Sequence, residues 1–301
     1  MSIKFGLYFY PWYHPQKWKE APTPYHPLRG FYDSKDPEIV KWQINLIHWC
    51  GFDYVIFEFV PVNDWNFGHC VMAIEEAIRP LRDRNMQWAF MIDCGVIPFS
   101  DNRIRDIEAM IRYIEDRRWT DALVRSGSGK PLWLLFSPLP DEAVYIQREF
   151  DAYEWRFPVW LPHWVEPDQR FALPAFRDFV AEALENNLTV FESLVRRNYI
   201  AFWESSYTPR NFNGFCSVTP GYLDTLLKRD PQLAPEVDRQ DGLTLTRQFH
   251  GAVETQPEHI LMYSWNEYFE GTSIEPTVEY NSTYVQIVQG LIGETRRQQA
   301  E

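Results

Sequence analysis

Three glutamates, Glu267, Glu270 and Glu275, stand close together near the C-terminal end of the chain. They follow an apolar run over residues 259–263 that is typical of a buried strand. Carboxylates at the end of a buried strand are costly unless they have a function. If the segment coils into a helical turn, Glu267 and Glu270, three residues apart, lie on one face of it.

Two neighbouring carboxyl groups are what the cleavage of a glycosidic bond requires. One stays protonated and acts as the acid, while the other is ionised and acts as base or nucleophile. The alternative is a surface turn that is merely rich in glutamate. Three aromatic residues in the same segment argue against a surface turn: Trp265, Tyr268 and Phe269.

The elements that would position these groups are strands that alternate with helical stretches, a pattern that indicates a parallel sheet. Eight strands are predicted, so we expect a single (β/α)8 barrel domain over residues 1–301. The predicted strands cover residues 4–10, 53–59, 88–93, 131–137, 157–162, 199–204, 215–219 and 260–265.

The clearest predicted helix covers residues 37–50, with Asp36 as N-cap, Pro37 at the first helical position and Gly51 as the stop. Further helices are predicted at residues 70–84, 103–118, 141–150 and 174–184.

Only residues 205–214 separate the sixth and seventh strands, and a parallel crossover normally needs more chain. Either a loop replaces that helix, which makes one β/α unit around residues 199–214 degenerate, or residues 199–204 belong to a preceding helix.

Active sites of such barrels lie at the carboxyl ends of the strands. Acidic and aromatic side chains gather there, and carboxylates bind sugar hydroxyls while ring faces stack on a pyranose, so we predict a carbohydrate site. The candidates for substrate binding are Tyr10, Trp12, Glu58, Asp93, His163, Tyr222, Trp265 and Asn266, and those for catalysis are Glu267 and Glu270.

Several candidates also have a purely structural interpretation. Trp12 could plug the barrel rim, and Asp93 could cap the next segment. His163 could be a hydrogen-bonded core group, and Glu275 could do no more than order its loop. Glu204 is a further carboxylate whose place depends on the sixth strand.

The composition indicates a soluble domain with a large core, since 45% of its residues are hydrophobic. A net charge of −13 argues against nucleic acid and anionic membranes as partners. The four cysteines lack metal-ligand or disulfide-framework spacing and are expected to be small buried apolar residues.

The N-terminal residues run into an apolar strand without a signal-peptide core, so the sequence as written predicts a cytoplasmic protein unless a signal was removed. At the other end, residues 293–301 are expected to fray.

Four motifs stand at the two ends of the chain: FYPWY at 9–13, YDSKDP at 32–37, SVTPGY at 217–222 and SWNEYFEGTSIEP at 264–276. In wording and order they resemble glycoside hydrolase family 99. The resemblance implies an enzyme that cleaves α-mannosidic linkages inside a glycan with retention, without metal or organic cofactor.

The resemblance also assigns roles. Glu267 would deprotonate the sugar's own 2-hydroxyl, which closes on the anomeric carbon as a 1,2-anhydro intermediate, while Glu270 protonates the leaving oxygen. Tyr222 would be functional because the family's tyrosine stands there.

Three departures from the family pattern predict a relative that acts on another glycan, such as a bacterial surface or exported polysaccharide. The second strand ends in Phe57-Glu58-Phe59 instead of paired tryptophans, and the third has Met91-Ile92-Asp93-Cys94 where a His-Ile-Glu-Pro-like stretch is usual. Tyr268-Phe269 fills the place of the family's usual residues between the signature glutamates.

Two rival hypotheses remain open. In one, the barrel is a non-hydrolytic glycan-binding or polysaccharide-biosynthesis protein. In the other, Glu58 or Glu204 acts with Glu267 as an ordinary two-carboxylate pair.

Overall fold

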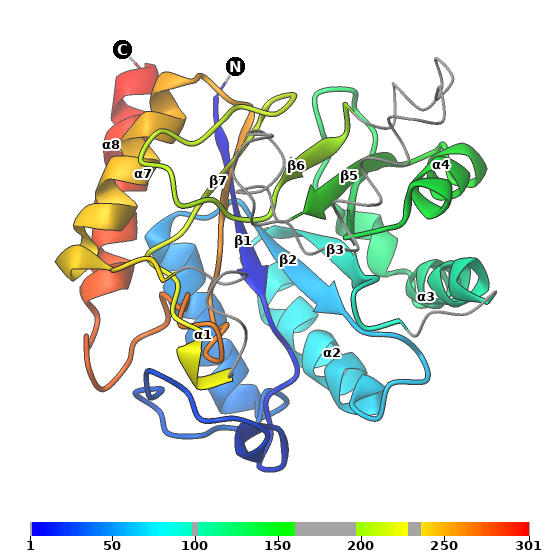
Figure 1. Ribbon diagram of the computed structural model, residues 1–301, viewed down its shortest axis with the longest axis horizontal. Coiled ribbons are helices and arrows are strands. Elements are labelled where there is room, and N and C mark those ends of the chain that lie inside the picture. Colours follow the sequence, from blue (N-terminus) through cyan, green and yellow to red (C-terminus); the bar gives the residue numbers. More distant parts are fainter. Residues whose placement is uncertain (1, 98–101, 160–196, 228–235, 301) are drawn as a thin grey trace.

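The computed structural model describes residues 2–97, 102–159, 197–227 and 236–300. Within them, eight parallel strands form a nearly closed barrel with helices on its outside (Figure 1), so the predicted fold is confirmed. The strands are β1 (Lys4–Phe9), β2 (Tyr54–Phe59), β3 (Gln87–Asp93), β4 (Leu132–Phe136), β5 (Glu154–Val159), β6 (Tyr199–Ala201), β7 (Phe215–Val218) and β8 (His259–Met262).

Every predicted strand overlaps an observed one, and the ends differ by at most three residues. The sixth strand is real because β6 pairs in parallel with β5. Its assignment to a preceding helix is therefore wrong. Residues 202–214, which the structure describes throughout, form a loop without a helix, so this β/α unit is degenerate as the first alternative predicted.

The helix α1 (Pro37–Cys50) has the predicted ends. The Asp36 carboxylate accepts a hydrogen bond from the backbone N–H of Glu38, and Gly51 adopts the left-handed conformation with φ 93°. The other α-helices are α2 (Phe67–Asp83), α3 (Arg103–Asp116), α4 (Pro140–Glu149), α7 (Leu243–Glu254) and α8 (Thr283–Ala300), and the short 3-10 helices are η1 (Lys17–Lys19), η2 (Trp119–Ala122), η4 (Thr225–Leu227) and η5 (Gln240–Gly242).

The helices α7 and α8 were not among the predicted elements, and the prediction that residues 293–301 fray is wrong for the described part of that tail. Arg296 near the end of α8 donates to the Gly51 carbonyl at 2.7 Å and pairs with Asp53 at 2.8 Å. The predicted helix at residues 174–184 lies outside the described residues. No described helix has both the length and the apolar character needed to cross a bilayer.

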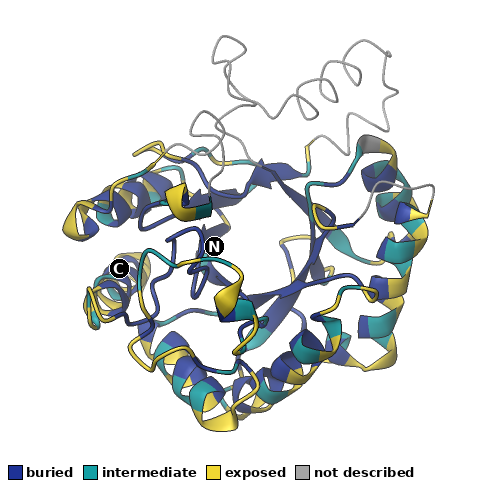
Figure 2. Cartoon of the chain, turned by 60° about the horizontal axis from the view of Figure 1, so that its bottom comes forward, coloured by how far each residue is buried: buried dark blue, intermediate teal, exposed yellow. Residues whose placement is uncertain are grey.

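Alternating residues of the strands enter two different apolar clusters. The outer cluster lies between sheet and helices and includes Leu7 and Val55, while the inner cluster fills the barrel and includes Tyr8 and Ile56. Figure 2 shows the buried strands as a continuous wall and the exposed residues mainly on the outer sides of the helices. All four cysteines are buried and free, as expected. The side chains that face the barrel interior therefore lead, at the carboxyl ends of the strands, to the predicted site.

The barrel has a seam between β6 and β7, because the hydrogen-bonded strand order runs from β6 through β5, β4, β3, β2, β1 and β8 to β7. Side chains bridge this seam instead of a backbone ladder. The Ser217 hydroxyl donates to the Ala201 carbonyl. Buried Gln248 of α7 accepts from the Thr219 N–H at 2.8 Å and donates to the Glu204 carbonyl at 3.2 Å.

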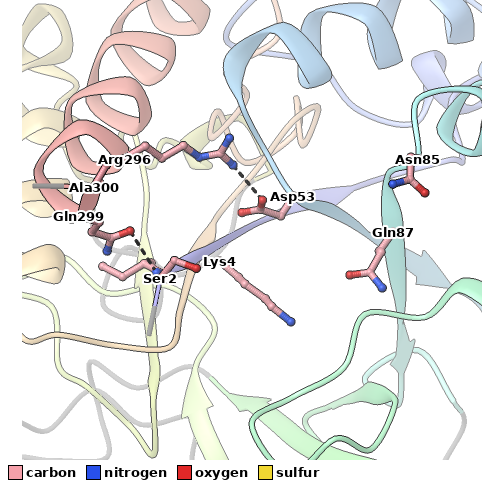
Figure 3. A pocket seen from close by; sticks show the side chains of 9 residues that line it. Ser2, Lys4, Asp53, Asn85, Gln87, Arg296, Gln299 and Ala300 are labelled. Carbon is pink, nitrogen blue, oxygen red and sulfur yellow. Dashed lines mark hydrogen bonds and ion pairs between the residues drawn. The ribbon is translucent and has the colours of Figure 1, made fainter.

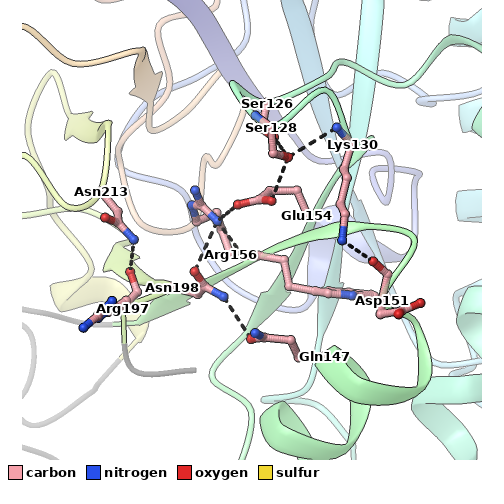
Figure 4. A network of polar contacts seen from close by, with 11 residues as sticks. Ser126, Ser128, Lys130, Gln147, Asp151, Glu154, Arg156, Arg197, Asn198 and Asn213 are labelled. Atoms are coloured by element: carbon pink, nitrogen blue, oxygen red, sulfur yellow. Dashed lines mark hydrogen bonds and ion pairs between the residues drawn. The ribbon is translucent and has the colours of Figure 1, made fainter. Parts of the chain in front are cut away.

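A polar network lies where β5, β6 and β7 begin, at the amino-terminal side of the seam (Figure 4). Arg156 of β5 bonds to the Glu154 carboxylate and to the Asn198 amide oxygen. Across the seam, the Asn213 amide donates to the Arg197 carbonyl at 2.8 Å. The two strands that lack a shared ladder are therefore tied together by side chains at three levels.

Candidate active site

The segment after β8 folds into a compact, hydrogen-bonded turn rather than the helical turn that was expected. The Ser264 hydroxyl accepts from the backbone N–H of Glu267 at 2.8 Å, and the Thr272 N–H donates back to the Glu267 carbonyl at 3.1 Å. Gly271, at φ 60°, closes the turn; a Cβ there would lie 3.0 Å from the Leu223 carbonyl oxygen. Glu267 and Glu270 are thereby held on one short, buried segment.

Each of the two glutamates contacts a tyrosine hydroxyl. One carboxylate oxygen of Glu267 accepts from the Phe269 N–H at 3.0 Å and lies 3.5 Å from the Tyr13 hydroxyl. The Tyr263 hydroxyl donates to Glu270 at 2.6 Å. Burial, followed by the Glu270 charge, raises the pKa of Tyr263 well above its ordinary value, so this tyrosine stays protonated and remains a donor.

Glu58 and Asp93, at the ends of β2 and β3, form a hydrogen-bonded pair inside the barrel mouth. Burial first, and then the Asp93 charge, raise the pKa of Glu58 well above its ordinary value. Burial also raises the pKa of Asp93, against hydrogen bonds that include one from the Gly95 N–H at 2.7 Å. The hydrogen bond between them raises the pKa of Glu58 and lowers that of Asp93, which favours the proton on Glu58.

Tyr10 shows that the acidic groups converge. Burial, followed by the charges of Glu58 and Glu267 and then that of Glu270, raises the pKa of its hydroxyl well above its ordinary value. Trp12 lies beside it, with ring centroids 4.8 Å apart, and is only half-buried, which suits a place on the rim. The ends of β1, β2 and β3 and the segment after β8 are thus brought together.

Lys17 brings a cation to this rim. Its ammonium lies 4.8 Å from the centroid of the Trp12 ring and 5.9 Å from that of Phe269. Its charge also lowers the pKa of Glu58, in opposition to burial.

Tyr222 is fully buried and stacks on Trp203 at the end of β6, with ring centroids 4.4 Å apart. Its hydroxyl donates to Asp224 at 2.8 Å.

The Glu204 carboxylate binds a residue of the loop that follows it. It accepts from the Arg210 N–H at 2.6 Å and pairs with the Arg210 guanidinium at 3.5 Å, which argues against a role as partner of Glu267.

Two predicted binding residues take structural positions. Trp265 is fully buried in the outer cluster between sheet and helices, not in the inner one. The Asn266 side chain bonds to both the N–H and the carbonyl of Tyr10, at 2.8 and 2.9 Å, and to the Tyr32 hydroxyl at 3.2 Å. Asn266 thus joins the end of β1 to the turn that carries Glu267 and Glu270. His163 lies outside the described residues.

Sequence reasoning missed Tyr263 and Lys17. Strand alternation contains a signal for Tyr263, because it stands two residues after Leu261, which faces the barrel interior. Nothing in the pattern singles out Lys17, which reaches the mouth from η1, a short helix in a loop.

Glu275 orders the loop, as the structural interpretation held. It accepts from the Tyr32 hydroxyl at 2.8 Å and from the Gln43 amide at 3.3 Å. Burial raises its pKa from 4.5 to about 8, against these hydrogen bonds. The folded state therefore binds a proton that the unfolded state has released, so this stabilisation is complete below pH 4.5 and is lost as the pH rises through about 8.

We therefore expect Glu275→Gln, which is neutral at every pH, to melt several degrees above the wild type at pH 9 and close to it at pH 5. The new amide can donate to the Gln43 side-chain oxygen, which is buried and has no hydrogen-bond partner. Thermal unfolding followed by circular dichroism at both pH values measures the effect. Glu279→Gln, at a more exposed glutamate paired with His26, is the control that should show no gain. An equal shift at both pH values would contradict the protonation argument.

A cavity of about 630 Å³ opens at the other end of the barrel, where the strands begin (Figure 3). Its lining mixes Lys4 with Asp53, Gln87 and Arg296. The ion pair between Asp53 and Arg296 crosses part of it. Because catalysis in these barrels takes place at the carboxyl ends of the strands, this cavity is separate from the candidate active site.

The comparisons agree with this architecture, although no protein-family model matches the chain. A curated relative, the glycoprotein endo-alpha-1,2-mannosidase of Mus musculus, is 19% identical over 274 residues. The match covers 84% of this chain and 57% of the relative, so the chain spans little more than half of that protein's length.

Solved structures share the fold over nearly the whole chain. Two are of the GH99 endo-alpha-mannosidase from Bacteroides thetaiotaomicron, one of them in complex with bis-tris-propane. Their TM-scores are 0.69 and 0.68 at 19% and 18% identity, with 100% and 99% of this chain and 100% and 98% of theirs covered. A glycoside hydrolase-like protein follows at 0.62 and 13% identity, over 97% of this chain and 94% of its own. The resemblance to family 99 that the four motifs indicate is confirmed.

Proposed function

We propose that this chain is a glycoside hydrolase that acts on α-linked, mannose-containing glycans. The observation that carries the proposal is the pair of buried carboxyl groups, Glu267 and Glu270, which one hydrogen-bonded turn holds at the mouth of the barrel. The names of the relatives reported above, two kinds of endo-alpha-mannosidase and a glycoside hydrolase-like protein, support it.

In the proposed mechanism, Glu267 removes the proton from the 2-hydroxyl of the sugar. The oxygen so freed bonds to the anomeric carbon as the glycosidic bond breaks, and Glu270 gives its proton to the departing oxygen. Water then attacks the anomeric carbon and gives a proton to Glu270, while the bond between that carbon and the 2-oxygen breaks and Glu267 returns its proton to the 2-oxygen. The two inversions give retention. The bonds from Tyr13 and Tyr263 hold the two carboxyl groups in the orientations that these transfers need.

The Glu58 and Asp93 pair is proposed to bind the sugar next to the scissile bond. A protonated carboxyl beside an ionised one offers both a donor and acceptors, which matches the dual character of a sugar hydroxyl. Tyr10 and Trp12 would supply the ring faces, while Tyr222, whose ring is stacked on Trp203, would support the wall of the site. Because both acids replace residues usual in family 99, the preferred glycan is proposed to differ from the family's.

The rival from another class is a non-hydrolytic glycan-binding or polysaccharide-biosynthesis protein on the same barrel. Two buried carboxyl groups on one turn favour catalysis, because a binding protein gains nothing from a costly acidic pair of this kind.

The function is tested by incubating the protein with a panel of α-mannans and bacterial α-linked polysaccharides. Product size separates cleavage inside the chain from cleavage at its end, and proton NMR of the first products gives the anomeric configuration. Release of shorter α-configured oligosaccharides is the expected result. Binding by calorimetry with no cleavage across the panel would favour the rival.

A further inference from the structure

Arg239 is a buried cation that the proposed mechanism does not use. It directly precedes η5, and only 3% of its surface is exposed. Its guanidinium carbon lies 4.5 Å from the ring centroids of Tyr25 and Tyr284 and 5.4 Å from that of Tyr280. Within the described part of the chain, no ion pair joins it to a carboxylate.

A buried charge of this kind is expensive unless its surroundings replace water. Three aromatic faces offset part of the desolvation. Two backbone carbonyls offset a further part, because one terminal nitrogen of Arg239 donates to Gly271 at 2.7 Å and to Ser273 at 2.8 Å. The other two guanidinium nitrogens are buried without a hydrogen-bond partner among the described residues.

Those carbonyls belong to the turn that carries the proposed general acid. Gly271 directly follows Glu270, and the Glu270 carbonyl itself accepts from the Leu223 N–H at 2.9 Å. Arg239 therefore binds the backbone next to Glu270, while Tyr263 binds the Glu270 carboxyl group.

The SVTPGY motif makes room for this arginine. A Cβ at Gly221 would lie 2.6 Å from the Arg239 side chain and 2.8 Å from the Val237 carbonyl oxygen. Tyr222 and Val237 exchange two backbone hydrogen bonds, of 2.9 and 2.8 Å, which fix the chain that leads to Arg239 against the motif.

We propose that Arg239 is a positioning residue for Glu270: it locks the Gly271–Ser273 backbone so that the acid meets the leaving oxygen at one fixed position. This inference rests on the proposed function, because it needs Glu270 to be the acid. It assigns Arg239 no contact with the substrate.

The test compares Arg239→Met, which loses charge and donors, with Arg239→Lys, which keeps the charge but not the forked donor. We expect kcat to fall about 100-fold in the first and about 10-fold in the second, with KM changed less than about threefold. Arg247→Met is the matched control, since Arg247 is an exposed arginine that also lies over a tyrosine ring, 5.2 Å from the Tyr207 centroid. It should keep wild-type kinetics.

Hydrogen exchange measured by mass spectrometry is a second readout that needs no turnover. Amides of residues 264–274 should exchange at least about tenfold faster in Arg239→Met than in the wild type or the control. Wild-type kcat in a folded Arg239→Met protein, or a loss confined to KM, would overturn the inference. If that variant does not fold, Arg239→Lys decides by the same criteria.

The two proposals fail in different ways. A wild-type protein that cleaves no glycan defeats the proposed function, and the exchange data then decide about Arg239 alone. Unchanged exchange over residues 264–274 would overturn its positioning role, while faster exchange would support it.

Discussion

Replacing either Glu267 or Glu270 by glutamine should lower kcat at least about a hundredfold on any glycan that the wild type cleaves. Glutamine keeps the size of the side chain but can neither take the proton of the 2-hydroxyl nor give one to the leaving oxygen. The hydrogen bonds from Tyr13 and Tyr263 can still go to the amide oxygen, so the fold should persist. Initial rates of reducing-end release measure the effect, and circular dichroism checks the fold.

A control comes from Glu294→Gln on α8, where the glutamate is exposed and lies in the last turns of the chain. Its kinetics should equal those of the wild type. Wild-type turnover in either signature variant would refute the assignment of that glutamate. If only Glu267→Gln lost activity, Glu267 would be the one catalytic carboxylate of this pair. The general acid would then have to be a group other than Glu270.

A glycoside whose 2-hydroxyl is replaced by hydrogen or fluorine should bind but not be cleaved, because the proposed reaction uses that oxygen as its internal nucleophile. The 2-deoxy compound is the sharper probe, since its glycosidic bond is intrinsically easier to break. The matched control is the parent glycoside with the same leaving group. Leaving-group release and binding by calorimetry give the two readouts.

A direct nucleophile would behave differently, because 2-fluoro sugars with good leaving groups then trap a covalent glycosyl-enzyme. Mass spectrometry of the intact protein detects that adduct. An adduct on Glu267 would refute the 2-hydroxyl route, and one on Glu58 would support an ordinary two-carboxylate pair. Cleavage of the 2-deoxy glycoside at the parent rate would also contradict the proposal.

Most helices and strands could be predicted from local patterns in the sequence. The ends of α1 follow from side-chain chemistry within one turn, as the bond between Asp36 and the Glu38 N–H shows. Strands are apolar runs whose pairing with their neighbours follows from the barrel rule. The tail of α8 was misjudged because its order depends on Asp53 and Gly51, about 240 residues away in sequence.

The site was predictable where a residue's face follows from strand alternation, as for Glu58 and Asp93. It was not predictable after the strands end. Trp265 and Asn266 stand beside Glu267, yet the turn sends one into the outer cluster and the other onto the Tyr10 backbone. The hydrogen bond from Arg239 to the Gly271 carbonyl joins two loops, and no local sequence pattern predicts that they are in contact.

The position of the seam between β6 and β7 determines which strand pairs are far apart in the sequence. Both edges of the hydrogen-bonded order come from the middle of the chain, while β1 and β8 are neighbours within it. The chain ends lie close together, with the Ile3 N–H 3.4 Å from the Gln299 side-chain oxygen (Figure 1). The hydrogen-bonded order therefore follows the sequence from β7 to β8 and, after the step from β8 to β1, from β1 to β6. A permuted variant that began at β7 and ended at β6, with residues 3 and 299 joined by a linker, would pair each described strand only with its neighbour in sequence. In the given order, the ladder between β1 and β8 is, among the described strands, the one that joins the most distant parts of the sequence, and contacts of this kind are the slowest for a folding polypeptide to find.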